Sequence, residues 1–275
     1  MKKLPEERFI SLNELNLHYV DWGNKASQPI VLLHGLCGYA HYWDFFAHRL
    51  SQSHHIIAID QRGHGDSDWM PSYYLNDFVI DLESFIAKLR LTDLVLIGHS
   101  LGGIIATIYA SHHPDQISRL VIVDIGPQIM TNGFERMEAV RQDEPQFFIS
   151  EDEVSDYLRQ IEPRQSAELI QQFILHALKK DQNSRLIFKY DKALHNLALR
   201  SPTWLWDDLD QIICPTLVMN GQDSDLLDLK VARKMVEKLP FGSLVVIEHA
   251  GHDLLVDNPE AFCSSIENFL NTVRV

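Results

Sequence analysis

The sequence has few cysteines and no long apolar run. Its 275 residues include three cysteines, Cys37, Cys214 and Cys263, which lie far apart and form no C-x-x-C pair. This odd, scattered set excludes a disulfide framework and a thiolate zinc site. No apolar run approaches the roughly 20 residues that a membrane-spanning helix needs, and no apolar segment follows the basic start of the chain. We therefore expect a cytoplasmic protein without a membrane span.

Positive charge is also in short supply. Lys and Arg number 24 against 38 Asp and Glu, so the formal net charge is −14 at pH 7. Nucleic-acid-binding surfaces need clustered Lys and Arg to neutralise phosphates, so we expect no nucleic-acid partner. Hydrophobic residues make up 45% and charged residues 23% of the chain, which is ordinary for a globular protein and excludes a disordered one. The length suits one large domain, or one domain that carries an insertion.

Short apolar runs alternate with longer amphipathic stretches, a pattern typical of a parallel sheet covered by helices. Residues 9–22 alternate with period two, which predicts an antiparallel hairpin of two short strands. Continuous apolar runs are typical of strands covered on both faces, and they occur at 30–33, 56–59, 94–97, 120–123, 216–219 and 244–247. Helical spacing of apolar residues predicts helices at 75–89, 101–112, 231–239 and 261–273.

One long stretch interrupts this alternation. From about Gly126 to Pro202 the sequence shows amphipathic helical patterns and no strand. We interpret residues 127–202 as a helical cap or lid, inserted into an α/β core made of residues 1–126 and 203–275. A lid of this kind normally encloses an apolar pocket. We expect some of the aromatic residues of the insertion and its exit to face that pocket: Phe134, Phe147, Phe148, Tyr157, Phe173, Phe188, Trp204 and Trp206.

The pentapeptide Gly98-His99-Ser100-Leu101-Gly102 follows an expected strand and opens an expected helix. That is the context in which G-x-S-x-G forms a nucleophile elbow. A sharp turn there holds the serine in a strained backbone conformation, and the residues two before and two after it must be small. Gly98 and Gly102 meet this demand. The pattern therefore predicts that Ser100 is a nucleophile.

A serine hydroxyl is a poor nucleophile until a base takes its proton. Among the 14 histidines of the chain, His252 stands out because it directly follows the last expected strand. This position places it on a loop at the carboxyl edge of the sheet, where the nucleophile also lies, so we expect it to be the base. No H-E-x-x-H or comparable cluster is present, and we therefore expect no metal and no cofactor.

Four motifs, in this order along the chain, resemble those of the α/β-hydrolase superfamily: Val31-Leu32-Leu33-His34-Gly35, Asp60-Gln61-Arg62-Gly63-His64-Gly65-Asp66-Ser67, Gly98-His99-Ser100-Leu101-Gly102-Gly103 and Gly251-His252. The resemblance implies an α/β fold with a mostly parallel eight-stranded sheet, helices on both faces and a helical cap inserted after strand six. It extends to small bacterial carboxylesterases whose triad acid follows the sixth strand. In the second motif we expect Arg62 to pair with a nearby carboxylate or carbonyl and hold a tight loop.

The acid of the triad departs from the commoner pattern of this family, which places an Asp three residues after Gly221. That position holds Ser224. Asp225 lies one residue late, whereas Asp124 ends the strand at 120–123, on the same edge of the sheet as the nucleophile. A minority of family esterases resemble the latter arrangement. We therefore predict Asp124 as the acid that orients His252, with Ser224 as an accessory hydrogen-bond partner and Asp225 as the alternative acid.

An oxyanion hole needs two backbone N–H groups aimed at the developing negative charge. The elbow geometry assigns one to Leu101, and the family resemblance assigns the other to Leu36. We expect hydrolysis of a small carboxylic ester with an apolar acyl group, through an acyl-enzyme, by a monomer or a homodimer. The same triad could serve C–C bond hydrolysis, perhydrolysis or acyl transfer, and a non-enzymatic binding module of this fold is a third class.

Overall fold

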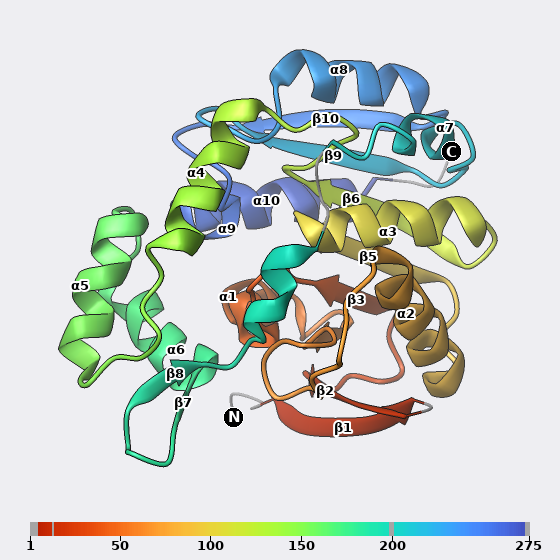
Figure 1. The fold of residues 1–275 in the computed structure, drawn as a ribbon. Coiled ribbons are helices and arrows are strands. Elements are labelled where there is room, and N and C mark those ends of the chain that lie inside the picture. The colour runs from red at the N-terminus through yellow and green to blue at the C-terminus, as the bar shows by residue number, and fades with distance from the viewer. Residues whose placement is uncertain (1–4, 13, 198–200, 273–275) are drawn as a thin grey trace.

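The computed structural model describes residues 5–12, 14–197 and 201–272, and it is built around one large sheet (Figure 1). The eight strands lie in the order β1-β2-β4-β3-β5-β6-β9-β10. Their bounds are β1 Glu6–Leu12, β2 Leu15–Asp21, β3 Pro29–Leu33, β4 His55–Ile59, β5 Leu94–His99, β6 Ile117–Val123, β9 Thr216–Gly221 and β10 Gly242–Ile247. Every strand that the apolar runs predict is therefore present.

The strands of this sheet are mostly parallel. Only the β1–β2 and β2–β4 pairs are antiparallel, and the first of them is the predicted hairpin. The remaining neighbours run parallel. Parallel strands end at the same edge of a sheet, which is where open α/β folds place their ligands. Ser100, Asp124 and His252 follow the carboxyl ends of β5, β6 and β10, so the topology brings three distant segments to one edge.

Helices cover both faces of the sheet, as expected. Helices α2, α3, α7 and α8 pack on one face, and η1, α1, α9 and α10 pack on the other. Within β5, Leu96 belongs to the first apolar layer and Val95 and Ile97 to the second, which is why the strand is apolar at every position. The bounds are η1 Ala40–Trp43, α1 Asp44–Leu50, α2 Leu75–Leu89, α3 Leu101–His112, α7 Leu205–Leu209, α8 Leu229–Lys238, α9 Leu254–Asp257 and α10 Pro259–Leu270.

Two predicted helices have different ends. Helix α8 begins at Leu229, two residues before the predicted start at 231, because the Asp228 side chain accepts a hydrogen bond from the N–H of Lys230 (2.6 Å) and caps the helix. Helix α10 ends at Leu270, and Val273, to which the prediction extended, lies outside the described residues. No helix in the described part of the chain is long and apolar enough to cross a membrane.

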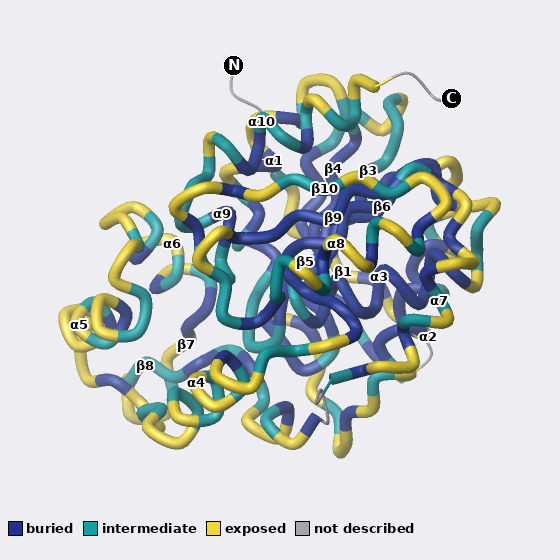
Figure 2. The backbone as a smooth tube through the Cα atoms, turned by 90° about the horizontal axis from the view of Figure 1, so that it is seen from above, coloured by how far each residue is buried: buried dark blue, intermediate teal, exposed yellow. Residues whose placement is uncertain are grey.

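The segment between β6 and β9 corresponds to the predicted helical insertion. It contains α4 Thr131–Gln142, α5 Glu151–Ile161, α6 Ala167–Ala177, β7 Leu178–Lys180, β8 Leu186–Phe188 and η2 Lys192–Asn196. The expectation of a strand-free segment is wrong, since β7 and β8 pair as an antiparallel hairpin. Each has only three residues, which is too short to leave a recognisable period in the sequence. Figure 2 shows that α4 and α5 carry many exposed residues, whereas the inner strands β4, β5, β6 and β9 are buried.

Candidate active site

Ser100 stands alone between β5 and α3, with φ 53° and ψ −118°. A positive φ is costly for a residue with a side chain and persists only where the surroundings enforce it. Its backbone N–H is held by the carbonyl oxygen of Val123 at 3.1 Å, which ties the turn to the neighbouring strand β6. The strand, the strained serine and the helix together form the elbow that the sequence predicts.

The two glycines of the elbow have no room for a side chain. A Cβ on Gly98 would lie 2.2 Å from the carbonyl oxygen of Gly102, and a Cβ on Gly102 would lie 2.3 Å from that of Leu33. Both obstacles are backbone atoms, which cannot swing aside as a side chain can. This geometry agrees with the prediction that only a residue without a side chain fits at these two positions.

His252 lies on the loop between β10 and α9. Its Nδ1–H donates to Oδ2 of Asp124 at 2.9 Å, so the other ring nitrogen, Nε2, is left to accept a proton. Burial lowers the pKa of His252, but the hydrogen bond and the negative charge of Asp124 outweigh it, and the net pKa is raised above the usual histidine value. The pair is an imidazole whose protonated form is favoured by a fixed carboxylate.

Asp124 is fully buried at the end of β6, and each of its oxygens has polar partners. Oδ1 accepts the N–H of Gly221 at 2.9 Å and the side-chain amide of Asn220 at 3.2 Å. Oδ2 accepts the hydroxyl of Ser224 at 2.5 Å in addition to His252. These donors satisfy a buried charge that would otherwise be very unfavourable.

Asp225, the alternative acid, has a different partner. Its carboxylate accepts two hydrogen bonds from the guanidinium of Arg136, at 2.6 and 3.2 Å. Arg136 belongs to α4, so this ion pair connects the segment after β6 to the loop after β9. Of the two acids that the sequence leaves open, it is Asp124 that the structure joins to His252 by a hydrogen bond.

Ser100 and His252 share one large cavity of about 980 Å³. In the described chain, His252 is hydrogen-bonded through Nδ1 to Asp124 and through its backbone oxygen to His99, and no bond joins it to the Ser100 hydroxyl. Catalytic hydrogen bonds are often long until a substrate is bound. The two side chains thus line one cavity, with no hydrogen bond between them in the described part of the chain.

His99, inside the elbow, supports the loop of His252. Its Nε2–H donates to the backbone oxygen of His252 at 3.0 Å, and the ring of Tyr42 stacks on it with centroids 5.5 Å apart. Burial, followed by the repulsion of His252, lowers the pKa of His99 to about 4. A neutral imidazole at this position can donate to the carbonyl and adds no charge beside Ser100.

The two expected oxyanion-hole donors, Leu36 and Leu101, come from the loop after β3 and from the start of α3. Leu101 is the first residue of α3, so its N–H has no partner inside the helix. Its side chain is buried and does not line the cavity, whereas Leu36, in the loop after β3, does. Two neutral histidines hold this loop: Nε2 of His64 accepts the N–H of Cys37 at 3.0 Å, and Nδ1 of His34 donates to the carbonyl oxygen of Gly35 at 2.7 Å.

These histidines were not singled out by the sequence analysis. Burial, together with the repulsion of His34, lowers the pKa of His64 to about 3, and burial also lowers the pKa of His34. Both therefore stay neutral and can each accept one hydrogen bond and donate another. The expectation for Arg62 is confirmed, since it binds Asp81 with two hydrogen bonds of 2.6 and 2.7 Å.

The segment after β6 supplies a large part of the cavity wall. Of the eight aromatic residues expected to be near the pocket, Tyr157, Phe173 and Phe188 line the cavity. Phe148 is instead buried against Tyr157 and Phe188. The other four are not among the lining residues: Phe134, Phe147, Trp204 and Trp206. The sequence predicts an aromatic wall but cannot show which rings form it.

Charged groups also face this cavity. Glu162, which follows α5, lies with its carboxylate 4.0 Å from Arg136, and both line the cavity with Asp253. Burial, and then the charge of Asp253, raises the pKa of Glu162 to about 7. No pattern in the sequence indicates this carboxyl, because Asp253, the charge that acts on it most strongly, lies about 90 positions away in the chain. The charge of Glu162, and with it the net charge of the cavity wall, therefore depends on pH near neutrality.

Within the described residues, two groups of side chains could hold a metal ion: His41 with Asp44 and His176, and His18 with Asp60 and Asp66. Neither group contains Ser100, His252 or Asp124. A hydroxyl, an imidazole and a carboxylate are the side-chain groups of a Ser-His-Asp triad, which needs no metal ligand.

A mostly parallel sheet with a serine at a strand-to-helix elbow is typical of α/β-hydrolases. A family model described as the alpha/beta hydrolase fold matches residues 28–259, and the chain belongs to that family. The resemblance inferred from the four sequence motifs is thereby confirmed, and so is the fold class of a mostly parallel, eight-stranded sheet covered by helices.

Individual relatives extend over nearly the whole chain. The 2-(acetamidomethylene)succinate hydrolase of Mesorhizobium japonicum is 27% identical over 249 residues, which are 90% of this chain and 90% of that protein. Esterase Rv0045c of Mycobacterium tuberculosis is 26% identical over 263 residues, 91% of this chain and 85% of that esterase. The crystal structure of E-2-(acetamidomethylene)succinate hydrolase superimposes with a TM-score of 0.88 at 25% identity, covering 98% of this chain and 100% of that one.

Proposed function

We propose that the protein is a serine hydrolase that cleaves small carboxylic esters through an acyl-enzyme. The observation that carries the proposal is the 2.9 Å hydrogen bond between His252 and Asp124, which lies at the sheet edge that also holds the strained Ser100. An oriented imidazole beside an elbow serine is the arrangement that turns a hydroxyl into a nucleophile. The similarity to a named esterase supports an ester as substrate.

In the proposed reaction, Ser100 Oγ attacks the ester carbonyl while Nε2 of His252 takes the hydroxyl proton. Asp124 stabilises the imidazolium that forms. The backbone N–H groups of Leu36 and Leu101 bind the oxyanion of the tetrahedral intermediate. The intermediate collapses as His252 returns the proton to the leaving alcohol, and a water, deprotonated by His252, then hydrolyses the acyl-enzyme and frees Ser100.

We propose further that residues 127–202 form the cap of a core made of residues 1–126 and 203–275. This segment supplies Tyr157, Phe173 and Phe188 to the cavity wall. Aromatic rings favour an apolar acyl chain over a strongly polar one, because burying apolar surface is favourable by about 25 cal/mol per Å². The three cysteines are free thiols, which supports a reducing, cytoplasmic setting.

A panel of p-nitrophenyl esters of graded acyl length, run beside a vinylogous diketone, tests the reaction class. Faster turnover of the esters supports ester hydrolysis, and faster cleavage of the diketone indicates C–C bond hydrolysis by the same triad. Ser100→Ala should reduce kcat by about 10⁶-fold, with an unchanged unfolding transition. Ser155→Ala, a serine of α5 outside the cavity lining, is the matched control and should keep full activity.

Covalent labelling tests the nucleophile directly. A fluorophosphonate reagent should attach to Ser100 in the wild-type protein and in Ser155→Ala, and it should not label Ser100→Ala. Labelling of another residue, or none at all in a folded wild-type protein, would indicate a binding module of this fold in place of a serine hydrolase.

A further inference from the structure

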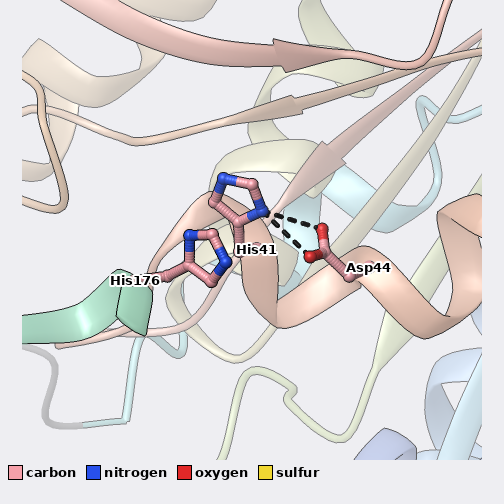
Figure 3. A group of neighbouring side chains, drawn as sticks. All are labelled: His41, Asp44 and His176. Carbon is pink, nitrogen blue, oxygen red and sulfur yellow. Dashed lines mark hydrogen bonds and ion pairs between the residues drawn. The ribbon is translucent and has the colours of Figure 1, made fainter. Parts of the chain in front are cut away.

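Three potential metal ligands meet at a point where the core contacts the segment after β6. His41 lies on η1, Asp44 begins α1, and His176 lies in the last turn of α6. Figure 3 shows the rings of His41 and His176 stacked on one another, with the carboxylate of Asp44 beside them. The ring centroids are 3.6 Å apart at an interplanar angle of 22°, and one donor atom of each residue lies within 4.8 Å of the others.

The hydrogen bonds of His41 resemble those of a metal-ligating histidine. Its Nδ1 faces both oxygens of Asp44, at 3.0 and 2.9 Å. Its Nε2 lies 3.2 Å from Oε1 of Glu7 on β1. Histidines that bind a metal through one ring nitrogen almost always donate the other N–H to a carboxylate or carbonyl, which fixes the ring. Glu7 occupies that supporting position.

We propose that His41, Asp44 and His176 form a binding site for a divalent transition-metal ion of the Zn²⁺ type. Two imidazoles and one carboxylate are a donor set suited to such ions, and the remaining coordination positions are left for water. The inference does not depend on the proposed function, because none of the three residues belongs to the proposed triad.

Small movements bring the donors into coordination distance. Ligands at about 2.0–2.2 Å from one Zn²⁺ lie no more than about 4.4 Å apart, so the separations of up to 4.8 Å must close slightly. The stacked rings must also turn, since a lone pair lies in the plane of its ring. His176 is half-buried whereas His41 is buried, so rotation of His176 about its side-chain torsions brings its nitrogen toward the space that Nδ1 of His41 and Asp44 share.

The second cluster, His18 with Asp60 and Asp66, is less suited to a metal. Oδ1 of Asp60 accepts the N–H of Ala40 at 2.6 Å. Oδ2 already accepts Nδ1–H of His18 at 2.6 Å and the N–H of Asp66 at 3.0 Å. A metal there would have to displace several protein donors from a buried carboxylate. The Asp44 side chain, by contrast, is hydrogen-bonded only to His41 among the described residues.

A bound metal would fasten α6 to the core at the edge of the cavity. His41 and Asp44 line that cavity, as does Phe173 on α6, whose ring packs against Tyr39 with centroids 5.8 Å apart. An ion that bridges η1, α1 and α6 would hold this aromatic contact in place. The site would therefore stabilise the cavity wall without touching Ser100 or His252.

Isothermal titration with ZnCl₂, and the visible absorption of Co²⁺ as a second probe, test the site in the intact protein. We expect one equivalent to bind the wild type and to raise its thermal midpoint, because a ligand that binds the folded state stabilises it. His176→Ala and Asp44→Asn should weaken binding at least 10-fold. Glu7→Gln, which keeps the shape of the side chain, should weaken it by roughly 10- to 100-fold. His112→Ala, on the exposed end of α3, is the control and should bind as the wild type does.

Thermal unfolding of each variant without metal shows whether it is folded. Zn²⁺ affinity that is unchanged in a folded His176→Ala protein overturns the proposal, as does the absence of binding to the wild type. Two further variants identify competing sites: loss of binding in Cys37→Ser would assign the metal to the cavity thiol, and loss in His252→Ala would assign it to the histidine that Asp124 binds. Either result would contradict the site proposed.

Discussion

Ser224 donates its hydroxyl to Oδ2 of Asp124 at 2.5 Å, across 100 positions of sequence. The serine stands where the commoner pattern of the family has its acid, and the aspartate that it binds is the one joined to His252. Ser224 Oγ also accepts the N–H groups of Leu226 and Leu227, at 3.2 and 3.1 Å. The residue at position 224 therefore holds the carboxylate that contacts the imidazole and does not itself contact the imidazole.

Replacing each candidate acid by its amide distinguishes their roles. Asp124→Asn should reduce kcat by about 10³- to 10⁴-fold, because the amide neither fixes the required tautomer of His252 nor stabilises the imidazolium. Asp225→Asn should cost less than about 10-fold, since that carboxylate pairs with Arg136 at a partly exposed site. Steady-state kinetics with a p-nitrophenyl ester gives both numbers. Equal losses, or a larger loss for Asp225→Asn, would reverse the assignment.

Moving the acid to its commoner position tests the geometry more sharply. Asp124→Ser alone should inactivate the enzyme to about the level of Asp124→Asn. Adding Ser224→Asp in the same chain places a carboxylate beside the vacated space, within reach of Nδ1 of His252, and should restore kcat at least 10-fold over Asp124→Ser. Ser224→Ala, with Asp124 intact, is the control for loss of the hydroxyl. No recovery in a folded double variant would show that the acid works only from the end of β6.

The turn that holds Ser100 and the position of its two candidate partners were predictable from the sequence. A strand-to-helix turn of this sharpness leaves no room for a Cβ at Gly98 or Gly102, so the spacing of two glycines around Ser100 identifies the turn without coordinates. His252 was distinguishable from the other histidines because it directly follows a strand of recognisable pattern. Asp124 was predicted because Ser224 occupies the position where the family commonly has its acid, and because Asp124 ends a strand at the same edge of the sheet as Ser100. Their catalytic roles remain predictions.

The segment after β6 was predictable only in outline. Its helices follow from apolar spacing, but β7 and β8 have three residues each and leave no period. Which aromatic rings face the cavity depends on how the helices rotate over the sheet, and nothing local distinguishes buried Phe148 from cavity-lining Phe173. The His41–His176 stack joins residues that are neighbours only after folding. Long-range packing of this kind has no signature in a single sequence.

Gly98→Ala should destabilise the fold severely. Its Cβ would lie 2.2 Å from the carbonyl oxygen and 2.4 Å from the carbonyl carbon of Gly102, and backbone atoms can move only if the elbow itself shifts. We expect a loss of about 3 kcal/mol or more in the free energy of unfolding, measured by urea denaturation. Gly251→Ala is the control, because the nearest atom to its Cβ would be 3.3 Å away, on the side chain of Asp257. Similar unfolding midpoints for the two variants would contradict this account of the elbow.

Arg136 should influence the pH dependence of catalysis through His252. Burial lowers the pKa of His252, Asp124 raises it above its usual value, and the positive charge of Arg136 opposes that rise. The imidazole must be neutral to accept the proton of Ser100, so kcat/KM should increase as pH rises through the pKa of His252 in the free enzyme. Removing the positive charge in Arg136→Gln favours the imidazolium, and the acidic limb of the profile should therefore move to higher pH.

Arg141→Gln is the matched control for this shift. Arg141 lies on the same helix α4, lines the same cavity and pairs with Glu138 at 2.9 Å, but it is not among the main groups that shift the pKa of His252. Its acidic limb should coincide with that of the wild type. High salt should shrink the shift in Arg136→Gln, because screening weakens charge interactions that solvent can reach. An acidic limb that moves to lower pH in Arg136→Gln, or moves equally in both variants, would show that His252 is not the group whose titration controls the rate.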